Sequence, residues 1–309
     1  MLDLRQLRHF IAVAETLHFG RAAERLGMTQ PPLSQSIMAL ERDLGAALFV
    51  RTKRVVTLTD FGRQWLEHVR PAVKGITELS DTAERLRTGK AGRLLLSFIS
   101  IADYNVLPML VERYSESFPD VELELTETTS DLQVAALLEG RINAGILISA
   151  RSALPSALDY HPLVIERLVA AVPESWIVEG RLLVVDGMIR SDNWMTQPLI
   201  MFPARVSPDF HDLVMGFYRA RGCQPFIQQE AIQMQTIISL VSAGLGMALV
   251  PASMQHLART GVRYVAVAGE APMLETGLAW RKADGSPALA GLIAISSTYC
   301  RPPTDGGGA

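Results

Sequence analysis

Polar side chains between residues 29 and 38 have the chemistry needed to read the edges of DNA bases. The set combines two amides, two hydroxyls and a thioether: Thr29, Gln30, Ser34, Gln35 and Met38. A glutamine amide can donate to adenine N7 and accept from the adenine amino group at once, whereas hydroxyls contact bases or phosphates less selectively. The same polarity would also suit an ordinary solvated helix face. The choice depends on the elements that carry these residues.

Three helices are predicted around this set, in the order of a helix-turn-helix. Apolar residues at spacings of three and four mark a first helix over residues 4–17. A short helix follows over residues 21–26 and stops at Gly27. The third begins after Thr29, has prolines in its first turn and ends at Gly45. In this arrangement the first turns of the third helix enter the major groove.

A basic hairpin is predicted after the third helix. Two short β segments, residues 48–50 and 55–58, flank a tip with three cations and a hydroxyl: Arg51, Thr52, Lys53 and Arg54. Such a wing suits phosphates or the minor groove, although a surface turn with stray charges has the same composition. Residues 1–90 carry 14 Lys and Arg against 10 Asp and Glu, while the remainder carries 15 against 22. The formal net charge of −3 therefore hides a basic N-terminal part that suits a polyanion.

The order of these segments resembles the LysR-type transcriptional regulators, most closely those that control the breakdown of aromatic compounds. The resemblance is carried by the runs LRQLRHF (4–10), GRAAERL (20–26), TQPPLS (29–34), LERDLG (40–45), LFVR (48–51) and LTDFG (58–62). It implies a winged helix-turn-helix that binds double-stranded promoter DNA as a dimer of dimers. It places Gln30, Pro31 and Ser34 near bases or backbone, and Arg51 and Arg54 on the wing. Many members have arginine where this chain has Gln35, so the target sequence cannot be carried over.

A long helix is predicted over residues 59–88. Its apolar residues follow alternating steps of four and three: Trp65, Val69, Ala72, Ile76, Leu79, Ala83 and Leu86. We interpret this narrow stripe as a coiled-coil dimerisation seam, because the opposite face is charged; packing on its own domain is the alternative. Pro71 lies inside the helix, so contacts with other segments or with a partner must hold it.

Beyond a linker at residues 88–92, strand-like and helical patterns alternate. The apolar runs are 94–99, 121–125, 142–148, 199–202 and 247–250, and the helical patterns are 106–118, 132–139, 210–219 and 236–243. This α/β body is larger than one such sheet usually needs. The resemblance implies a periplasmic-binding-protein-like effector domain of two subdomains, with crossovers near Pro162 and Ala268, a return through residues 273–280 and a final helix over 287–300.

Hydroxyl-bearing residues follow several of these strands, where open α/β sheets bind ligands. With helix N-termini they favour an anion, although each hydroxyl could instead cap a helix. In the family, the positions that match Ser100, Ser130 and the Phe202–Pro203 turn line the effector cleft. We expect a small carboxylate with an apolar or aromatic body, with Arg205 as its counter-ion. The expected effector-binding residues are Ser100, Ile101, Thr129, Ser130, Phe202, Pro203, Arg205 and Gln228, with Gln233 and Gln235 as further candidates from the second lobe.

Two other classes of protein fit the sequence less well. An enzyme lacks support because no Gly-x-Ser-x-Gly, dinucleotide-binding, phosphate-loop or His-Glu-x-x-His motif is present, and His161 and His211 stand alone. A solute-binding protein could share the two-lobed body, but it would have no use for residues 1–60. It would also need an export signal, whose features the N-terminus lacks. Cys223 and Cys300 form neither a disulfide framework nor a metal motif. We expect no cofactor and no metal, and a redox role of Cys223 stays open.

The predicted layout is a winged helix-turn-helix, mainly α with a β wing, over 1–60, a linker helix over 61–89 and an effector domain over 90–301. Its first subdomain takes 90–161 and 268–301 and its second takes 162–267, before a loose tail at 302–309. We expect a cytoplasmic bacterial regulator in which a small effector between the lobes changes the arrangement of the DNA-bound heads. Its partners are promoter DNA, the effector and further copies of itself, with RNA polymerase as another candidate and no membrane.

Overall fold

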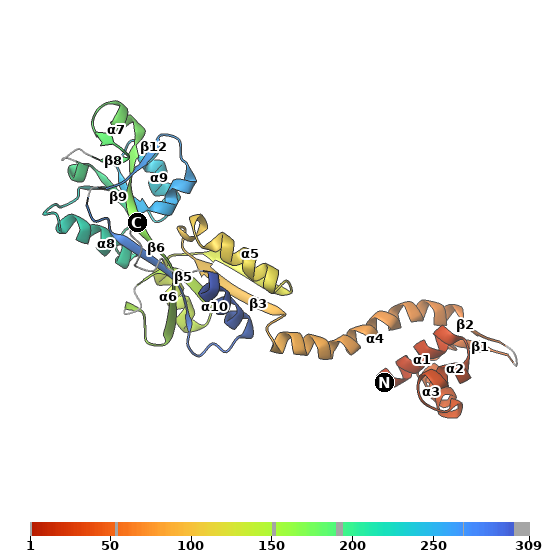
Figure 1. Ribbon diagram of the computed structural model, residues 1–309. Helices are drawn as coiled ribbons and strands as arrows, with labels where there is room; N and C mark the ends of the chain where they lie inside the picture. Colours follow the sequence, from red (N-terminus) through yellow and green to blue (C-terminus); the bar gives the residue numbers. More distant parts are fainter. Residues whose placement is uncertain (1, 53–54, 150–152, 190–193, 268, 300–309) are drawn as a thin grey trace. The chain divides into compact units, whose positions relative to one another are not determined.

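The computed structural model describes residues 2–52, 55–149, 153–189, 194–267 and 269–299. The chain divides into two compact units, Met1–Glu84 and Arg85–Ala309 (Figure 1). Within the described ranges, no helix combines the length and the apolar character needed to cross a bilayer.

The N-terminal unit contains three helices, a hairpin and most of a long helix. These are α1 Leu4–Thr16, α2 Phe19–Arg25, α3 Gln30–Leu44, β1 Phe49–Arg51, β2 Val56–Leu58 and α4 Asp60–Arg87. The second helix begins two residues before the predicted position, because His18 Nδ1 accepts the backbone N–H of Arg21 at 3.2 Å and caps it. Gly45 ends α3 with a φ of 68°, a conformation that glycine adopts without cost.

One hydrophobic core holds this unit together. Leu33, Ile37 and Leu40 form the buried side of α3. The ring of Phe10 on α1 lies 5.6 Å from the ring of Phe49 on the wing and 4.9 Å from that of Trp65 on α4. The wing and the start of α4 therefore belong to the same core as the three helices.

The second unit is built on a mixed sheet with the strand order β11-β6-β13-β5-β3-β4, in which β12 also pairs with β6. Its first lobe contains β3 Gly92–Phe98, β4 Val121–Glu127, β5 Ala144–Ile148, β13 Met273–Arg281 and the first part of β6 Leu158–Pro173. Strand β3 lies parallel to both β4 and β5, whereas β13 is antiparallel to β5. Each strand of this lobe except β6 overlaps a segment predicted from the sequence.

Helices cover both faces of the first lobe. The helices are η1 Ala102–Tyr104, α5 Leu107–Ser117, α6 Ser130–Glu139 and α10 Pro287–Tyr299. The Tyr114 hydroxyl on α5 donates to the Ala288 carbonyl on α10 at 3.1 Å, and these two helices lie together in Figure 1. On β5, Ile146 joins the core beneath α5 and α10, while Leu147 joins a cluster with Leu137 of α6. This alternation matches the two-residue period of a strand.

The second lobe contains β9 Leu199–Met201, β10 Ile227–Glu230, β11 Ala248–Pro251, β12 Val262–Val265, α7 Glu174–Val178, α8 Pro208–Arg219, α9 Met234–Ser242 and η4 Ala252–Leu257. A small hairpin, β7 Val184–Val185 and β8 Met188–Ile189, and η3 Trp194–Thr196 complete it.

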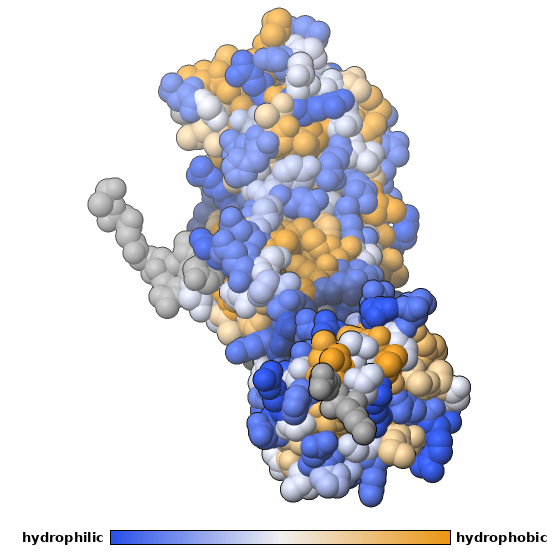
Figure 2. Space-filling view, turned by 90° about the vertical axis from the view of Figure 1, so that its right-hand side faces the viewer, coloured by the Kyte–Doolittle hydropathy of each residue, from blue (hydrophilic) through white to orange (hydrophobic). Residues whose placement is uncertain are grey.

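Figure 2 shows one face of the whole chain, on which hydrophilic residues are mixed with several separate apolar patches.

Strand β6 connects the two lobes. Its residues 158–167 pair with β13, and its residues 168–173 pair with β11 and β12. Pro162, where a crossover was predicted, lies inside this strand opposite Gly277, at a shift in register. Beside the strand, the Glu166 carboxylate accepts from Asn105 Nδ2 at 3.0 Å and from the backbone N–H of Ser253 at 2.7 Å. The other predicted crossover, at Ala268, lies outside the described residues.

Candidate DNA-binding surface and effector pocket

The outer side of α3 carries the residues predicted to read DNA. Thr29, Gln30, Pro31, Gln35 and Met38 are exposed. Ser34 is half-buried between them, and the Thr29 side chain makes no capping hydrogen bond to the helix. Spacings of three to four residues align these side chains on one side because Leu33, Ile37 and Leu40 hold the other side in the core.

The wing is joined to this helix by Glu41, a residue that no pattern in the sequence singles out. One Glu41 oxygen accepts the backbone N–H groups of Leu48 and Phe49 at 2.9 and 3.2 Å. The other accepts from Arg51 Nη2 at 3.0 Å, and the Arg51 guanidinium lies 4.6 Å from the centre of the Phe19 ring. The predicted DNA contact of Arg51 would therefore have to compete with Glu41, because this cation is paired inside its own domain.

The tip of the wing is closed by Thr52. Its backbone N–H donates to the Val55 carbonyl at 2.9 Å, and its hydroxyl accepts the Val55 N–H at 3.0 Å. Gln30, Thr52 and Val55 line the same open groove, so the start of α3 and the wing border one surface. Lys53 and Arg54, the other predicted wing contacts, lie outside the described residues.

The predicted dimerisation stripe on α4 has two parts that differ in burial. Val69 is 4% exposed and Trp65 is half-buried against Phe10, so the first part belongs to the core of the N-terminal unit. This stretch thus packs on its own domain, which is the alternative that the sequence left open. Exposed apolar residues of the remaining stripe are Ala72, Ile76, Leu79, Ala83 and Leu86.

A pocket in the second unit lies at the carboxyl ends of four strands. Its lining follows β3, β4, β5 and β9, and it has about 440 Å³ of empty volume including its open mouth. The lining residues are Ile99, Ser100, Ile101, Glu127, Thr128, Thr129, Ser130, Ile148, Phe202, Val206, Ser207, Ile232 and Gln233. Both lobes contribute, since β3, β4 and β5 belong to the first and β9 to the second.

Five of the eight predicted effector-binding residues line this pocket: Ser100, Ile101, Thr129, Ser130 and Phe202. Ser100 Oγ accepts the Met234 N–H at 3.4 Å, and Ser130 Oγ accepts the Ile148 N–H at 3.3 Å. These two buried hydroxyls thus hold the pocket walls together. Gln233, a further candidate, also lines the pocket, whereas Gln235 does not.

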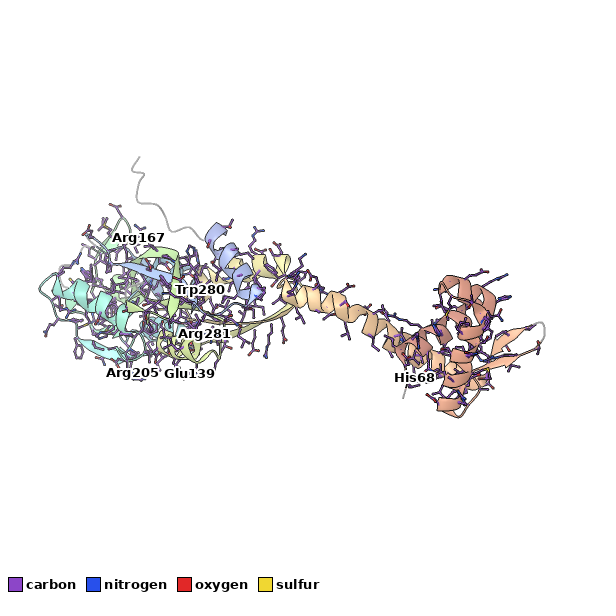
Figure 3. All side chains as sticks on the ribbon, turned by 90° about the horizontal axis from the view of Figure 1, so that it is seen from below. His68, Glu139, Arg167, Arg205, Trp280 and Arg281 are labelled. Atoms are coloured by element: carbon purple, nitrogen blue, oxygen red, sulfur yellow. The ribbon has the colours of Figure 1, made fainter. Side chains whose placement is uncertain are left out.

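Pro203, Arg205 and Gln228 do not line the pocket, so the structure does not bring them together with the other five. A turn in which the Val206 N–H donates to the Pro203 carbonyl at 3.1 Å directs Val206 and Ser207 inward and leaves Arg205 exposed. Figure 3 shows Arg205 at the outer edge of the second unit in that view. Gln228 is exposed on β10, at the irregularity in its pairing with β9.

Glu127, the last residue of β4, is an ionisable pocket residue that was not predicted from the sequence; Ile99, Ile148, Val206, Ser207 and Ile232 were not predicted either. Partial burial and the negative charge of Asp103 raise the pKa of the Glu127 carboxyl, and a hydrogen bond from the Gln233 side chain partly offsets this rise. The described part of the chain contains no cluster of His, Cys, Asp and Glu arranged to hold a metal ion. The sequence placed Glu127 two residues after the predicted strand 121–125 and directly before Thr128, where a ligand-facing residue was expected.

Comparison with known proteins places both units in one family. Residues 4–63 match the bacterial regulatory helix-turn-helix protein, lysR family, and residues 87–301 match the LysR substrate binding domain. The chain is 59% identical over 295 residues to the HTH-type transcriptional regulator IlvR of Caulobacter vibrioides, covering 95% of this chain and 97% of that protein. It is 34% identical over 286 residues to the HTH-type transcriptional regulator CatR of Pseudomonas putida, covering 93% and 95%.

Among solved structures, full-length CbnR complexed with its target DNA matches with a TM-score of 0.78 and 27% identity, over 97% of this chain and 100% of that chain. The likeness therefore extends over the helix-turn-helix, the long helix and the two-lobed unit alike. On this combination of geometry and sequence, the chain belongs to the LysR family of DNA-binding transcriptional regulators and not to a class of enzymes.

Proposed function

We propose that this regulator binds promoter DNA through α3 and the wing, and that a small effector in the pocket changes how its DNA-binding heads are arranged. The single observation that carries the effector role is the pocket at the carboxyl ends of β3, β4, β5 and β9, which belongs to both lobes. A ligand that touches both lobes binds differently to their open and closed arrangements, and only such a difference can shift an equilibrium.

The effector is a small carboxylate with an apolar or aromatic body. The hydroxyls of Ser100 and Ser130 and the start of α6 supply donors for the carboxylate, while Ile101 and Phe202 supply an apolar wall. Arg205, the predicted counter-ion, lies outside the pocket lining, so this geometry does not support that role. Base reading falls to Thr29, Gln30, Pro31, Ser34, Gln35 and Met38, and phosphate contacts fall to the wing residues Lys53 and Arg54.

The assembly we propose is a dimer of dimers in the cytoplasm, paired through the exposed stripe of α4, with RNA polymerase as a further partner. The working layout remains 1–60 for the head, 61–89 for the linker helix and 90–301 for the effector domain, with lobes 90–161 plus 268–301 and 162–267 and a tail at 302–309.

The test is a titration of the full chain with a labelled fragment of its own upstream region, with and without candidate aromatic and aliphatic acids. Ile232→Trp fills the pocket mouth, and Leu245→Trp is its control, since both residues are 42% exposed but only Ile232 lines the pocket. We expect both variants to bind DNA and only Ile232→Trp to lose the response to the acid. A response that survives in Ile232→Trp would place the effector elsewhere.

A further inference from the structure

The effector pocket has an unusual charge for a site that takes a carboxylate. Its lining contains one ionisable side chain, Glu127, and no Lys, Arg or His among the residues that the structure describes there. A ligand with only a negative charge would meet no cation in this lining. The only ionisable group among the described residues of this lining would instead attract a positively charged group of a ligand.

The position of Glu127 is fixed by the backbone around it. It ends β4 in parallel register with Phe98 of β3, and the next residue, Thr128, donates its N–H to the Phe98 carbonyl at 2.9 Å. The Thr128 carbonyl in turn accepts from Gln133 Nε2 at 3.0 Å. The Glu127 carboxyl thus stands at one side of the pocket on a rigid strand end.

The partners of this carboxyl are an amide and a second acid. Gln233, from the second lobe, hydrogen-bonds to Glu127, and the carboxylate of Asp103 on η1 acts on it by charge repulsion. An amide donor satisfies one lone pair, and because Glu127 is exposed, the rest of its carboxyl is open to water or to a ligand. Charge-assisted hydrogen bonds from a ligand cation are about twice as strong as neutral ones and would supply that compensation.

The hydroxyls complete a second polar region in the same pocket. Ser100 and Ser130 each accept a backbone N–H, from Met234 and Ile148. A hydroxyl that accepts in this way keeps its own proton to donate. The same lining also contains apolar side chains, among them Ile99, Ile148 and Phe202.

We propose that the effector carries a protonated amine that binds Glu127, in addition to a carboxylate held by the Ser100 and Ser130 hydroxyls and an apolar body between them. An α-amino acid with a hydrocarbon side chain has this composition. This inference rests on the proposed effector role of the pocket and narrows the ligand from an acid to a zwitterion. Gln233 brings the second lobe to the same carboxyl, so the amine is bound where the lobes meet.

The test uses two sets of three probes. Each set contains an amino acid, the matching acid without the amine and the matching amine without the carboxylate. The aliphatic set is leucine, 4-methylpentanoate and 3-methylbutylamine, and the aromatic set is phenylalanine, 3-phenylpropanoate and 2-phenylethylamine. Calorimetric titration of the full chain at neutral pH gives the affinity of each probe. We expect at least one amino acid to bind at least about tenfold more tightly than both of its own analogues.

Glu127→Gln keeps the size of the side chain and one acceptor oxygen, replaces the other oxygen with an NH2 donor and removes the charge. It should abolish the preference for the amino acid over the matching acid. Glu122→Gln is the matched control, because Glu122 lies on the same strand but does not line the pocket, and it should leave the preference unchanged.

Three results would overturn the inference: tighter binding of an acid than of its amino acid, an unchanged preference in Glu127→Gln, or no binding of either amino acid at millimolar concentration. Each is separable from failure of the proposed function. If an acid without an amine binds and alters promoter affinity, the effector role of the pocket stands and only the proposed amine is refuted. Promoter binding in the same preparation reports separately on the DNA-binding heads.

Discussion

Arg51 on the wing donates to Glu41 on the recognition helix, and so the hairpin and α3 are joined by an ion pair. The pair is partly shielded, with the Arg51 side chain 32% and the Glu41 side chain 18% exposed. An arginine engaged in this way positions the wing for DNA and does not itself have to contact a phosphate.

We therefore expect Arg51→Ala to weaken promoter binding with little change in its salt dependence. Removing one cation from a DNA phosphate would reduce the slope of log affinity against log salt by about one. Fluorescence anisotropy at several salt concentrations measures this slope. A slope lower by about one would show that Arg51 reaches a phosphate despite its partner.

Glu41→Ala removes the acceptor of two backbone N–H groups, those of Leu48 and Phe49. Leaving partly buried donors without an acceptor costs about 1–3 kcal/mol. Hydrogen exchange should show that both amides lose protection while α1 keeps it. Glu24→Ala, which removes a carboxylate from α2, serves as the control, and equal exchange at Leu48 in wild type and Glu41→Ala would refute the assigned role.

Gly62 allows α4 to begin against the wing. A Cβ at this position would lie 2.3 Å from the Leu48 carbonyl oxygen, so Gly62→Ala must displace backbone. We expect the N-terminal unit to lose about 1–3 kcal/mol of unfolding free energy. Chemical denaturation measures it, with Gly75→Ala as the control on the same helix.

At Gly75 no heavy atom lies within 4 Å of the added Cβ. Alanine there should raise stability by up to about 1 kcal/mol through helix propensity. If both substitutions changed the unfolding free energy in the same direction, the close approach at Gly62 would not matter to the fold.

The exposed stripe of α4 should mediate pairing of chains. Placing charges at Ile76 and Leu79, which are 45% and 60% exposed, should dissociate the assembly with little loss of fold. Sedimentation of Ile76→Glu/Leu79→Glu over a range of concentrations tests this. Lys74→Glu, off the stripe, is the control, and an unchanged assembly in the double variant would assign pairing to another surface.

The titration of Glu127 should respond to both of its neighbours. Burial and the Asp103 charge raise its pKa, and the Gln233 hydrogen bond lowers it. Asp103→Asn should therefore lower the pKa of Glu127, and Gln233→Leu should raise it, as followed by carboxyl NMR. Since the folded pKa is raised, the folded chain binds more protons than the unfolded chain in this range, and Glu127 reduces stability as pH rises through it.

Local patterns in the sequence predicted the elements and much of the site. Helix periodicity and the glycine at the end of α3 placed the reading face, and the rule that ligands follow strand ends placed Ser100 and Ser130. The errors come from tertiary contacts. Glu41 meets Arg51 across the fold, a turn sends Arg205 outward, and the covering of Val69 depends on α1 and the wing. Periodicity along α4 is the same for a buried residue and for a partner-facing one.

Strands β6 and β13 bear on how the two lobes can move. They run side by side, joined by antiparallel hydrogen bonds from Leu158 to Arg167, and the Leu168 N–H extends the contact to the Pro272 carbonyl. Two hydrogen-bonded strands resist sliding along each other far more than they resist bending or twisting together. Any change in the angle between the lobes would therefore have to bend or twist this pair of strands.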